Sequence, residues 1–124
     1  MRQELIAIVE DDDTVRVAIA NLLRSADLRS VGFASAEAFL AEDLSGFGCV
    51  LSDVQMPGLS GLDLLRVTRQ RRAELPVVLM TAYPDERVRQ RALAEGARFF
   101  LEKPTDPEML VANLRALLDA TPQG

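Results

Sequence analysis

Acidic residues and a single lysine follow separate apolar segments of this sequence, and together they could transfer a phosphoryl group. Glu10 and Asp11 come directly after the first apolar run, and Asp53 comes at the end of a later one. Lys103 is the only lysine among 14 basic residues and stands directly before a proline. A compact ammonium on a flexible stem suits a site that needs a point charge, which a planar guanidinium does not supply in the same way.

Carboxylates gathered in one place repel one another and raise each other's pKa, unless a cation neutralises them. With no histidine and one cysteine, the chain lacks the usual zinc ligands. Mg²⁺ prefers oxygen ligands and is typically held by one or two carboxylates and a phosphate. We therefore expect Mg²⁺, with Mn²⁺ or Ca²⁺ as substitutes. Its expected ligands are Asp11 and Asp53 directly, Glu10 through water, and the main-chain carbonyl of Gln55.

Asp53 is the expected nucleophile, because a carboxylate held beside a metal ion can attack an incoming phosphoryl group to give an acyl phosphate. The charge that develops on the phosphoryl oxygens needs cations and hydrogen-bond donors already in place. The Lys103 ammonium and the Thr81 hydroxyl would supply them. The small side chain of Ala82 leaves room for the group to enter.

The elements that must position these residues alternate along the chain. Apolar runs predict strands at residues 5–9, 29–33, 49–53, 76–81 and 99–101. Helical periodicity and capping residues predict helices at 14–24 (capped by Asp13 or Thr14), 35–44, 62–71, 84–95 and from Pro107 onward. Five such alternations indicate an α/β domain with a parallel sheet covered by helices on both faces. Ligands of such sheets bind outside the carboxyl ends of the strands, where all the residues named above fall.

The length and charge of the chain limit its class. A chain of 124 residues suits a single domain, expected at 1–120, with 121–124 as a tail or the start of a linker. No apolar run approaches the roughly 20 residues that cross a bilayer, and the first is too short for a signal peptide. We therefore expect a cytoplasmic protein that does not bind membranes. The net charge of −5 argues against direct contact with nucleic acid.

Four motifs, in this order and spacing, resemble the receiver domain of two-component response regulators. They are Val9-Glu10-Asp11-Asp12, the segment 51–58 around Asp53, Thr81-Ala82 and Lys103-Pro104. The resemblance covers about residues 4 to 120 and implies a flavodoxin-like sheet in the order 2-1-3-4-5 with five helices. It implies phosphotransfer from a histidine kinase to Asp53 and a cis peptide between Lys103 and Pro104. Such a domain is a signalling switch rather than an enzyme, with only self-phosphotransfer and self-dephosphorylation.

The segment from Phe99 to Pro104 looks most like receivers of the nitrogen-fixation and nitrate-response regulators, which carry a C-terminal DNA-binding domain. The resemblance implies that Thr81 and Phe100 form the switch. Phosphorylation would draw in the Thr81 hydroxyl and turn Phe100 inward, and so change the face made by the fourth and fifth helices and the fifth strand. That face would then bind a partner, commonly an identical receiver.

Two further positions are expected to set the lifetime of the phosphoryl group. Gln55 and Tyr83 stand two residues after Asp53 and Thr81, and would flank the path of an attacking water. A bulky Tyr83 should hinder that water, so the sequence predicts slow loss of phosphate.

Two other interpretations remain open at this point. The segment Asp11-Asp12-Asp13-Thr14-Val15 fits the D-x-D-x-[TV] pattern of haloacid-dehalogenase-like phosphohydrolases, with Asp11 as nucleophile and Asp13 as general acid. Those enzymes need further acidic residues after the lysine, whereas the acids after Lys103 fit the last helix. Asp12 and Asp13 are also typical of a helix start. The second interpretation is a receiver-like module that never accepts phosphate and works by protein contact alone.

Overall fold

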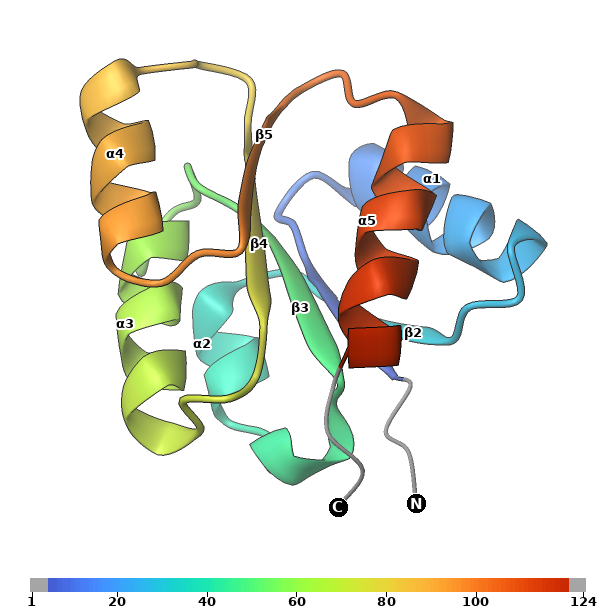
Figure 1. The fold of residues 1–124 in the computed structure, drawn as a ribbon, viewed down its shortest axis with the longest axis horizontal. Helices are drawn as coiled ribbons and strands as arrows, with labels where there is room; N and C mark the ends of the chain where they lie inside the picture. Colours follow the sequence, from blue (N-terminus) through green and yellow to red (C-terminus); the bar gives the residue numbers. More distant parts are fainter. Residues whose placement is uncertain (1–4, 121–124) are drawn as a thin grey trace.

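A five-stranded parallel sheet forms the middle layer of residues 5–120, the part of the chain that the computed structural model describes (Figure 1). Its strands are β1 Ile6–Val9, β2 Ser30–Phe33, β3 Cys49–Asp53, β4 Val77–Thr81 and β5 Phe99–Glu102. The strand order is β2-β1-β3-β4-β5, and every neighbouring pair is parallel. This confirms the flavodoxin-like order that the motifs implied. The tail expected at 121–124 lies outside the described residues.

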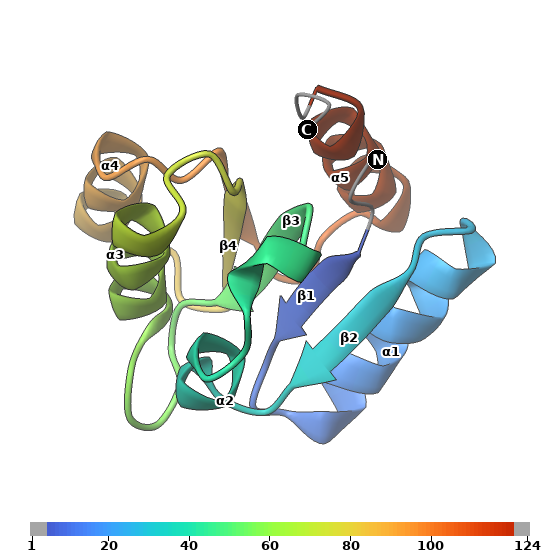
Figure 2. The ribbon, with the colours of Figure 1, turned by 90° about the horizontal axis from the view of Figure 1, so that it is seen from below.

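Helices cover both faces of this sheet. They are α1 Asp13–Ser25, α2 Ala36–Leu40, α3 Gly61–Arg71, α4 Glu86–Ala94 and α5 Pro107–Ala120. Figure 2 shows α1 and α5 on one face, with α2, α3 and α4 on the other. None of the helices within residues 5–120 is long and apolar enough to cross a bilayer.

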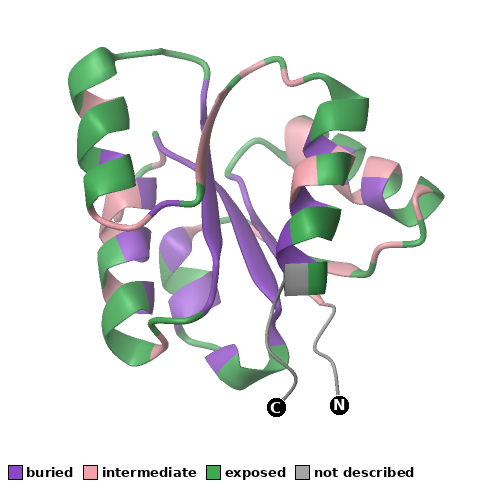
Figure 3. Cartoon of the chain, in the orientation of Figure 1, coloured by how far each residue is buried: buried purple, intermediate pink, exposed green. Residues whose placement is uncertain are grey.

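The core has two halves because successive strand residues point to opposite faces of the sheet. On β1, Ile6 and Ile8 pack with α1 and α5, whereas Ala7 and Val9 pack with α2, α3 and α4. The three central strands are buried on both faces (Figure 3), so their sequences are apolar runs, with polar residues only at their carboxyl ends, at Ser52, Asp53 and Thr81. The same alternation sends Phe99 and Phe100 to opposite halves of the core.

Asp12, rather than the expected Asp13 or Thr14, caps helix α1. Its side chain accepts hydrogen bonds from the main-chain N–H groups of Thr14 and Val15, while Asp13 is the first helical residue. The expectation was wrong by one residue because three successive aspartates all suit a helix start. At the start of α5, the Asp106 side chain accepts hydrogen bonds from the main-chain N–H groups of Glu108 and Met109.

Helix α2 ends at Leu40 and does not continue to residue 44 as predicted. The Asp43 carboxylate accepts a hydrogen bond from the Ser45 N–H and so starts a separate 3₁₀ turn, η1 Leu44–Gly46. The Arg71 guanidinium, from the end of α3, donates to the Leu40 carbonyl at 2.5 Å. An arginine distant in sequence therefore satisfies a helix-end carbonyl that would otherwise need the next turn.

Candidate phosphoryl-transfer site

Three carboxylates meet at the carboxyl ends of two adjacent strands. Glu10 directly follows β1, and Asp53 ends β3, which pairs with β1 so that Val9 lies opposite Ser52. Carboxylate oxygens of Glu10, Asp11 and Asp53 lie within 4.8 Å of one another. Glu10 and Asp53 are buried, whereas Asp11 is exposed at the rim. The sheet therefore brings together the acidic residues that the sequence selected.

Lys103 reaches the same point from the far end of the chain. It follows β5, and its main-chain N–H donates to the Thr81 carbonyl at 2.8 Å. Its Nζ lies 2.6 Å from Glu10 Oε1 and 3.3 Å from Asp53 Oδ2. The peptide between Lys103 and Pro104 is cis, as the resemblance implied.

The Lys103 ammonium and the Glu10 carboxylate each shift the pKa of the other. Burial raises the pKa of Glu10, and this outweighs the hydrogen bonds from Lys103 and from the Asp12 N–H, which lower it. Burial alone would lower the pKa of Lys103, but its hydrogen bond to Glu10 and the charge of Asp53 raise it overall. Lys103 is therefore a fixed positive charge at neutral pH.

Asp53 has one carboxylate oxygen that forms no hydrogen bond with any described residue. Its Oδ1 is buried without a hydrogen-bond partner, while Oδ2 faces Lys103. A buried polar atom without a partner is uncommon in folded proteins and calls for an ion, a water or a functional role. The atoms of the cluster that could bind a metal ion are all carboxylate oxygens, which is the ligand type that Mg²⁺ prefers. The residues present therefore fit the expected metal ion.

Thr81 is fully buried at the end of β4 and already has two hydrogen-bond partners. Its hydroxyl donates to Gln55 Oε1 at 2.8 Å and accepts from the Tyr83 N–H at 2.9 Å. Tyr83, in contrast, is 71% exposed. The sequence placed Gln55 and Tyr83 beside the site, but it gave no sign of the bond between Gln55 and Thr81.

The start of helix α3 lies very close to the backbone of Asp53 and Val54. A Cβ at Gly61 would lie 2.3 Å from the Asp53 carbonyl oxygen, so only glycine fits this close approach. Ser60 caps the helix in a reciprocal capping box with Asp63, in which each side chain accepts from the other residue's main-chain N–H.

The sequence did not predict the roles of Arg16 and Glu37. Arg16 contacts the segment after β1 that carries Glu10 and Asp11, and Glu37 contacts the loop after β3. The Arg16 guanidinium donates to the Glu10 carbonyl at 2.7 Å, and its stem crosses Gly32, where a Cβ would lie 3.1 Å from the arginine Cδ. Glu37 Oε2 accepts a hydrogen bond from the Leu59 N–H at 3.1 Å. A glycine inside a strand can signal such a close approach, so Gly32 was the available sign for Arg16.

Asp13 lies outside this cluster. Its side chain is 83% exposed and ion-paired with Arg16. The general acid that the phosphohydrolase interpretation requires is therefore not at the site, and that interpretation is not favoured.

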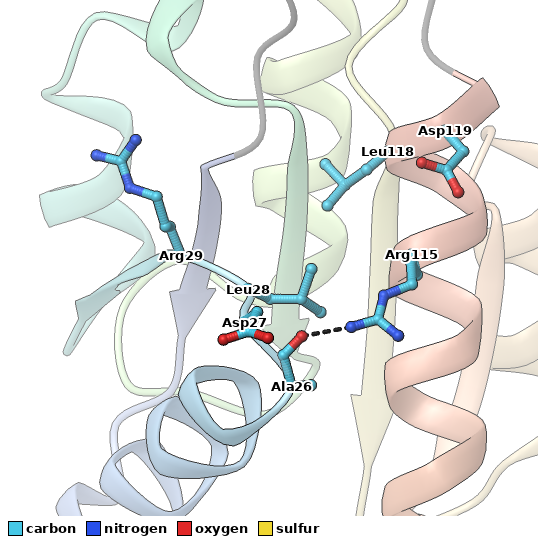
Figure 4. Close-up of a pocket in the computed structure, with 7 residues that line it drawn as sticks. All are labelled: Ala26, Asp27, Leu28, Arg29, Arg115, Leu118 and Asp119. Atoms are coloured by element: carbon cyan, nitrogen blue, oxygen red, sulfur yellow. Dashed lines mark hydrogen bonds between the residues drawn. The ribbon is translucent and has the colours of Figure 1, made fainter.

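A separate hollow lies at the opposite end of the sheet (Figure 4). It has a volume of about 250 Å³ and is lined by residues after α1 and near the end of α5. The Arg115 guanidinium reaches across from α5 to donate to the Ala26 carbonyl. None of the phosphoryl-transfer residues lines this hollow.

The strand order is that of a doubly wound α/β domain, and the carboxylates, hydroxyl and ammonium at the carboxyl ends of its strands suit phosphoryl-transfer chemistry. Residues 6–115 match the family model described as the response regulator receiver domain, and the chain belongs to this family.

Proteins with similar sequences support this family assignment. The chain is 40% identical over 114 residues to the transcriptional regulatory protein FixJ of Azorhizobium caulinodans, covering 91% of the chain and 54% of FixJ. It is 35% identical over 123 residues to the response regulator protein TodT of Pseudomonas putida, covering 98% of the chain and 54% of TodT. The chain therefore spans about half the length of these relatives.

Solved structures show the same fold. The structure of FixJ-N superposes with a TM-score of 0.89 at 26% identity, and all of both chains is covered. The receiver domain of DrrB, described as activated by BeF3, gives a TM-score of 0.85 at 29% identity and covers 94% of this chain and 98% of that one.

Proposed function

We propose that this receiver domain accepts a phosphoryl group on Asp53 from a phosphohistidine of a histidine kinase. An Asp53 carboxylate oxygen attacks phosphorus, the P–N bond breaks, and its electron pair leaves with the imidazole nitrogen. The product is an acyl phosphate on Asp53. The observation that carries this proposal is the placement of Asp53, buried between the Lys103 ammonium and a cluster of carboxylates, with one oxygen left without a partner.

Lys103 and Thr81 are the groups of the chain that would stabilise the transferred phosphoryl group. The ammonium lies 3.3 Å from Asp53 Oδ2 before any phosphate arrives, so it needs little rearrangement to meet the new charge. Asp11, Asp53, Glu10 through water and the Gln55 carbonyl are the proposed ligands of Mg²⁺, with Mn²⁺ or Ca²⁺ as substitutes. When bound, the cation supplies positive charge to the phosphoryl oxygens.

Loss of the phosphoryl group would occur by attack of water on phosphorus, which returns Asp53 to its carboxylate and releases phosphate. Gln55 and Tyr83 are the proposed rate-setting residues for this step. Gln55 lies within hydrogen-bond distance of Thr81, and Tyr83 stands two residues after Thr81. Both residues therefore border the loop from which the water would come.

The output of the switch is proposed to be the face made by α4, β5 and α5. Thr81 would move toward the phosphoryl group, and Phe100, now partly buried against the core on the α3 and α4 side, would turn further inward. The changed face would bind a second receiver of the same kind. Because the relatives named as transcriptional regulators are about twice as long as this chain, we propose a DNA-binding output domain C-terminal to it. Because a histidine kinase draws on ATP, we also expect the receiver to work in the cytoplasm.

Incubation with acetyl phosphate and Mg²⁺, followed by intact-mass measurement, tests the central proposal. The wild type should gain the mass of one phosphoryl group. Asp53→Asn should abolish the gain, whereas Asp13→Asn should leave it unchanged. A gain that survives in Asp53→Asn would show that another residue is the acceptor, and no gain in the wild type would favour a module that works by contact alone.

A further inference from the structure

The Thr81 hydroxyl already donates its only hydrogen in a hydrogen bond in this structure. A hydroxyl has one hydrogen to donate and two lone pairs to accept with. Thr81 donates that hydrogen to Gln55 Oε1 at 2.8 Å and accepts from the Tyr83 N–H at 2.9 Å. A phosphoryl oxygen on Asp53 accepts hydrogen bonds but cannot donate one, so it must compete with Gln55 for the same proton.

We propose that Gln55 is a positioning residue, whose side-chain amide holds the Thr81 hydroxyl away from Asp53 until a phosphoryl group takes over its proton. This inference rests on the proposed phosphorylation of Asp53. It assigns the Gln55 side chain a role distinct from metal binding by its main-chain carbonyl and from contact with the attacking water. The hydrogen bond favours the resting state, and its loss is part of the cost of switching.

Hydrogen bonds hold the backbone on both sides of Gln55 and so restrict where its side-chain amide can lie. Gln55 follows β3 by two residues, and the residue between, Val54, donates its N–H to the Met80 carbonyl of β4 at 2.9 Å. Farther along the loop, Leu59 is tied to Glu37 by a hydrogen bond of 3.1 Å. Gln55 therefore lies just past the end of β3, beside the paired strand β4 that ends in Thr81.

The difference in exposure of the two partners makes the bond reversible. Thr81 is fully buried, so its hydroxyl needs a partner inside the protein. Gln55 is exposed, so water can solvate its amide after release. The net contribution of one such hydrogen bond corresponds to roughly a three- to tenfold shift in an equilibrium constant.

The test is a double-mutant cycle between Gln55 and Thr81, read out as the dissociation constant for beryllofluoride, a phosphoryl mimic, in excess Mg²⁺. Tyr83 is the only tyrosine and the chain has no tryptophan, so its fluorescence reports on the neighbourhood of Thr81. Gln55→Met keeps the length of the side chain and its main-chain carbonyl but replaces the amide oxygen by a thioether, a much weaker acceptor. We expect beryllofluoride to bind roughly three- to tenfold more tightly to Gln55→Met than to wild type.

On a Thr81→Val background, which keeps the shape of the side chain and removes the hydroxyl, Gln55→Met should leave the dissociation constant unchanged. The matched control Gln70→Met, at an exposed position on α3, should behave as wild type. Unchanged or weaker binding in Gln55→Met, or the same tightening on both backgrounds, would overturn the inference. Failure of the wild type to bind beryllofluoride or to gain a phosphoryl group would instead overturn the proposed function, and this inference with it.

Discussion

Lys103 Nζ lies 2.6 Å from Glu10 Oε1, although 93 positions separate the two residues in sequence. Asp53 Oδ2 is the more distant partner of the same ammonium, at 3.3 Å. In this structure the single lysine charge offsets only part of the charge of the three carboxylates, and it lies closer to Glu10 than to Asp53. The ammonium and a divalent cation act on the same carboxylates with charges of the same sign, so each should weaken the other's hold.

Replacing Lys103 by Met should therefore tighten Mg²⁺ binding several-fold, because a positive charge next to the carboxylates is lost. Titration calorimetry of the unphosphorylated protein measures the affinity directly. Arg98→Met removes a positive charge from an exposed position and should leave the affinity nearly unchanged. Equal or weaker Mg²⁺ binding in Lys103→Met would contradict the assignment of Mg²⁺ to this cluster.

The positions of Glu10, Asp53 and Lys103 were predictable because of a property of parallel sheets. Each residue follows an apolar run long enough to be a buried strand, and the carboxyl ends of parallel strands meet at one edge. Knowing where each strand ended was therefore enough to predict that these side chains converge.

The contacts of Arg71 and Gln55 were not predictable in the same way. An arginine from another helix donates to the Leu40 carbonyl at the end of α2, and that contact depends on how two helices lie against each other. The bond from Thr81 to Gln55 depends on the path of the loop after β3, which no periodicity specifies. Sequence patterns therefore gave no information on how side chains are oriented across loops and between helices.

Gly61→Ala should destabilise the domain, because the new Cβ would lie 2.3 Å from the Asp53 carbonyl oxygen and 2.9 Å from the Val54 Cα. Both are backbone atoms, which cannot move aside without shifting β3. We expect a loss of about 1 to 3 kcal/mol in the free energy of unfolding, measured by urea denaturation. Gly46→Ala is the matched control, because the added methyl group would meet no atom within 4 Å beyond its chain neighbours, and it should change stability by less than about 0.5 kcal/mol. Similar losses in both variants would contradict the close approach.

Thr68 on α3 is fully buried, and its hydroxyl has no hydrogen-bond partner among the described residues. Thr68→Val replaces the hydroxyl by a methyl group of similar shape, and the two residues have similar helix propensity. The free energy of unfolding should rise by about 1 kcal/mol, since an unpaired polar group no longer has to be buried. Thr68→Ser keeps the hydroxyl but removes the methyl, so its stability should fall. A loss of stability in Thr68→Val would mean that the hydroxyl has a partner, such as a buried water.

Cys49 should make the stability of the domain depend on alkaline pH. Burial raises the pKa of its thiol to about 12. Above the ordinary thiol pKa the unfolded chain loses the proton while the folded chain keeps it, so stability falls as pH rises. Between about pH 9 and 11, the stability of wild type relative to Cys49→Ala should fall by up to about 1.4 kcal/mol per pH unit. Urea denaturation of both proteins across this range measures the difference, and a constant difference would show that the folded thiol ionises normally.

Tyr83→Ala should accelerate loss of phosphate from Asp53. The Tyr83 main-chain N–H, which donates to the Thr81 hydroxyl, is kept in this variant, so only the ring is removed. Because Tyr83 is 71% exposed, its ring can obstruct an incoming water without being part of the core, and removal of the ring should not destabilise the fold. We expect a several-fold higher rate of autodephosphorylation, followed by the decay of the phosphorylated mass after acetyl phosphate is removed. Met109→Ala removes another exposed apolar side chain, on α5, and should leave the rate unchanged. An unchanged or lower rate in Tyr83→Ala would remove the ring from the path of the water.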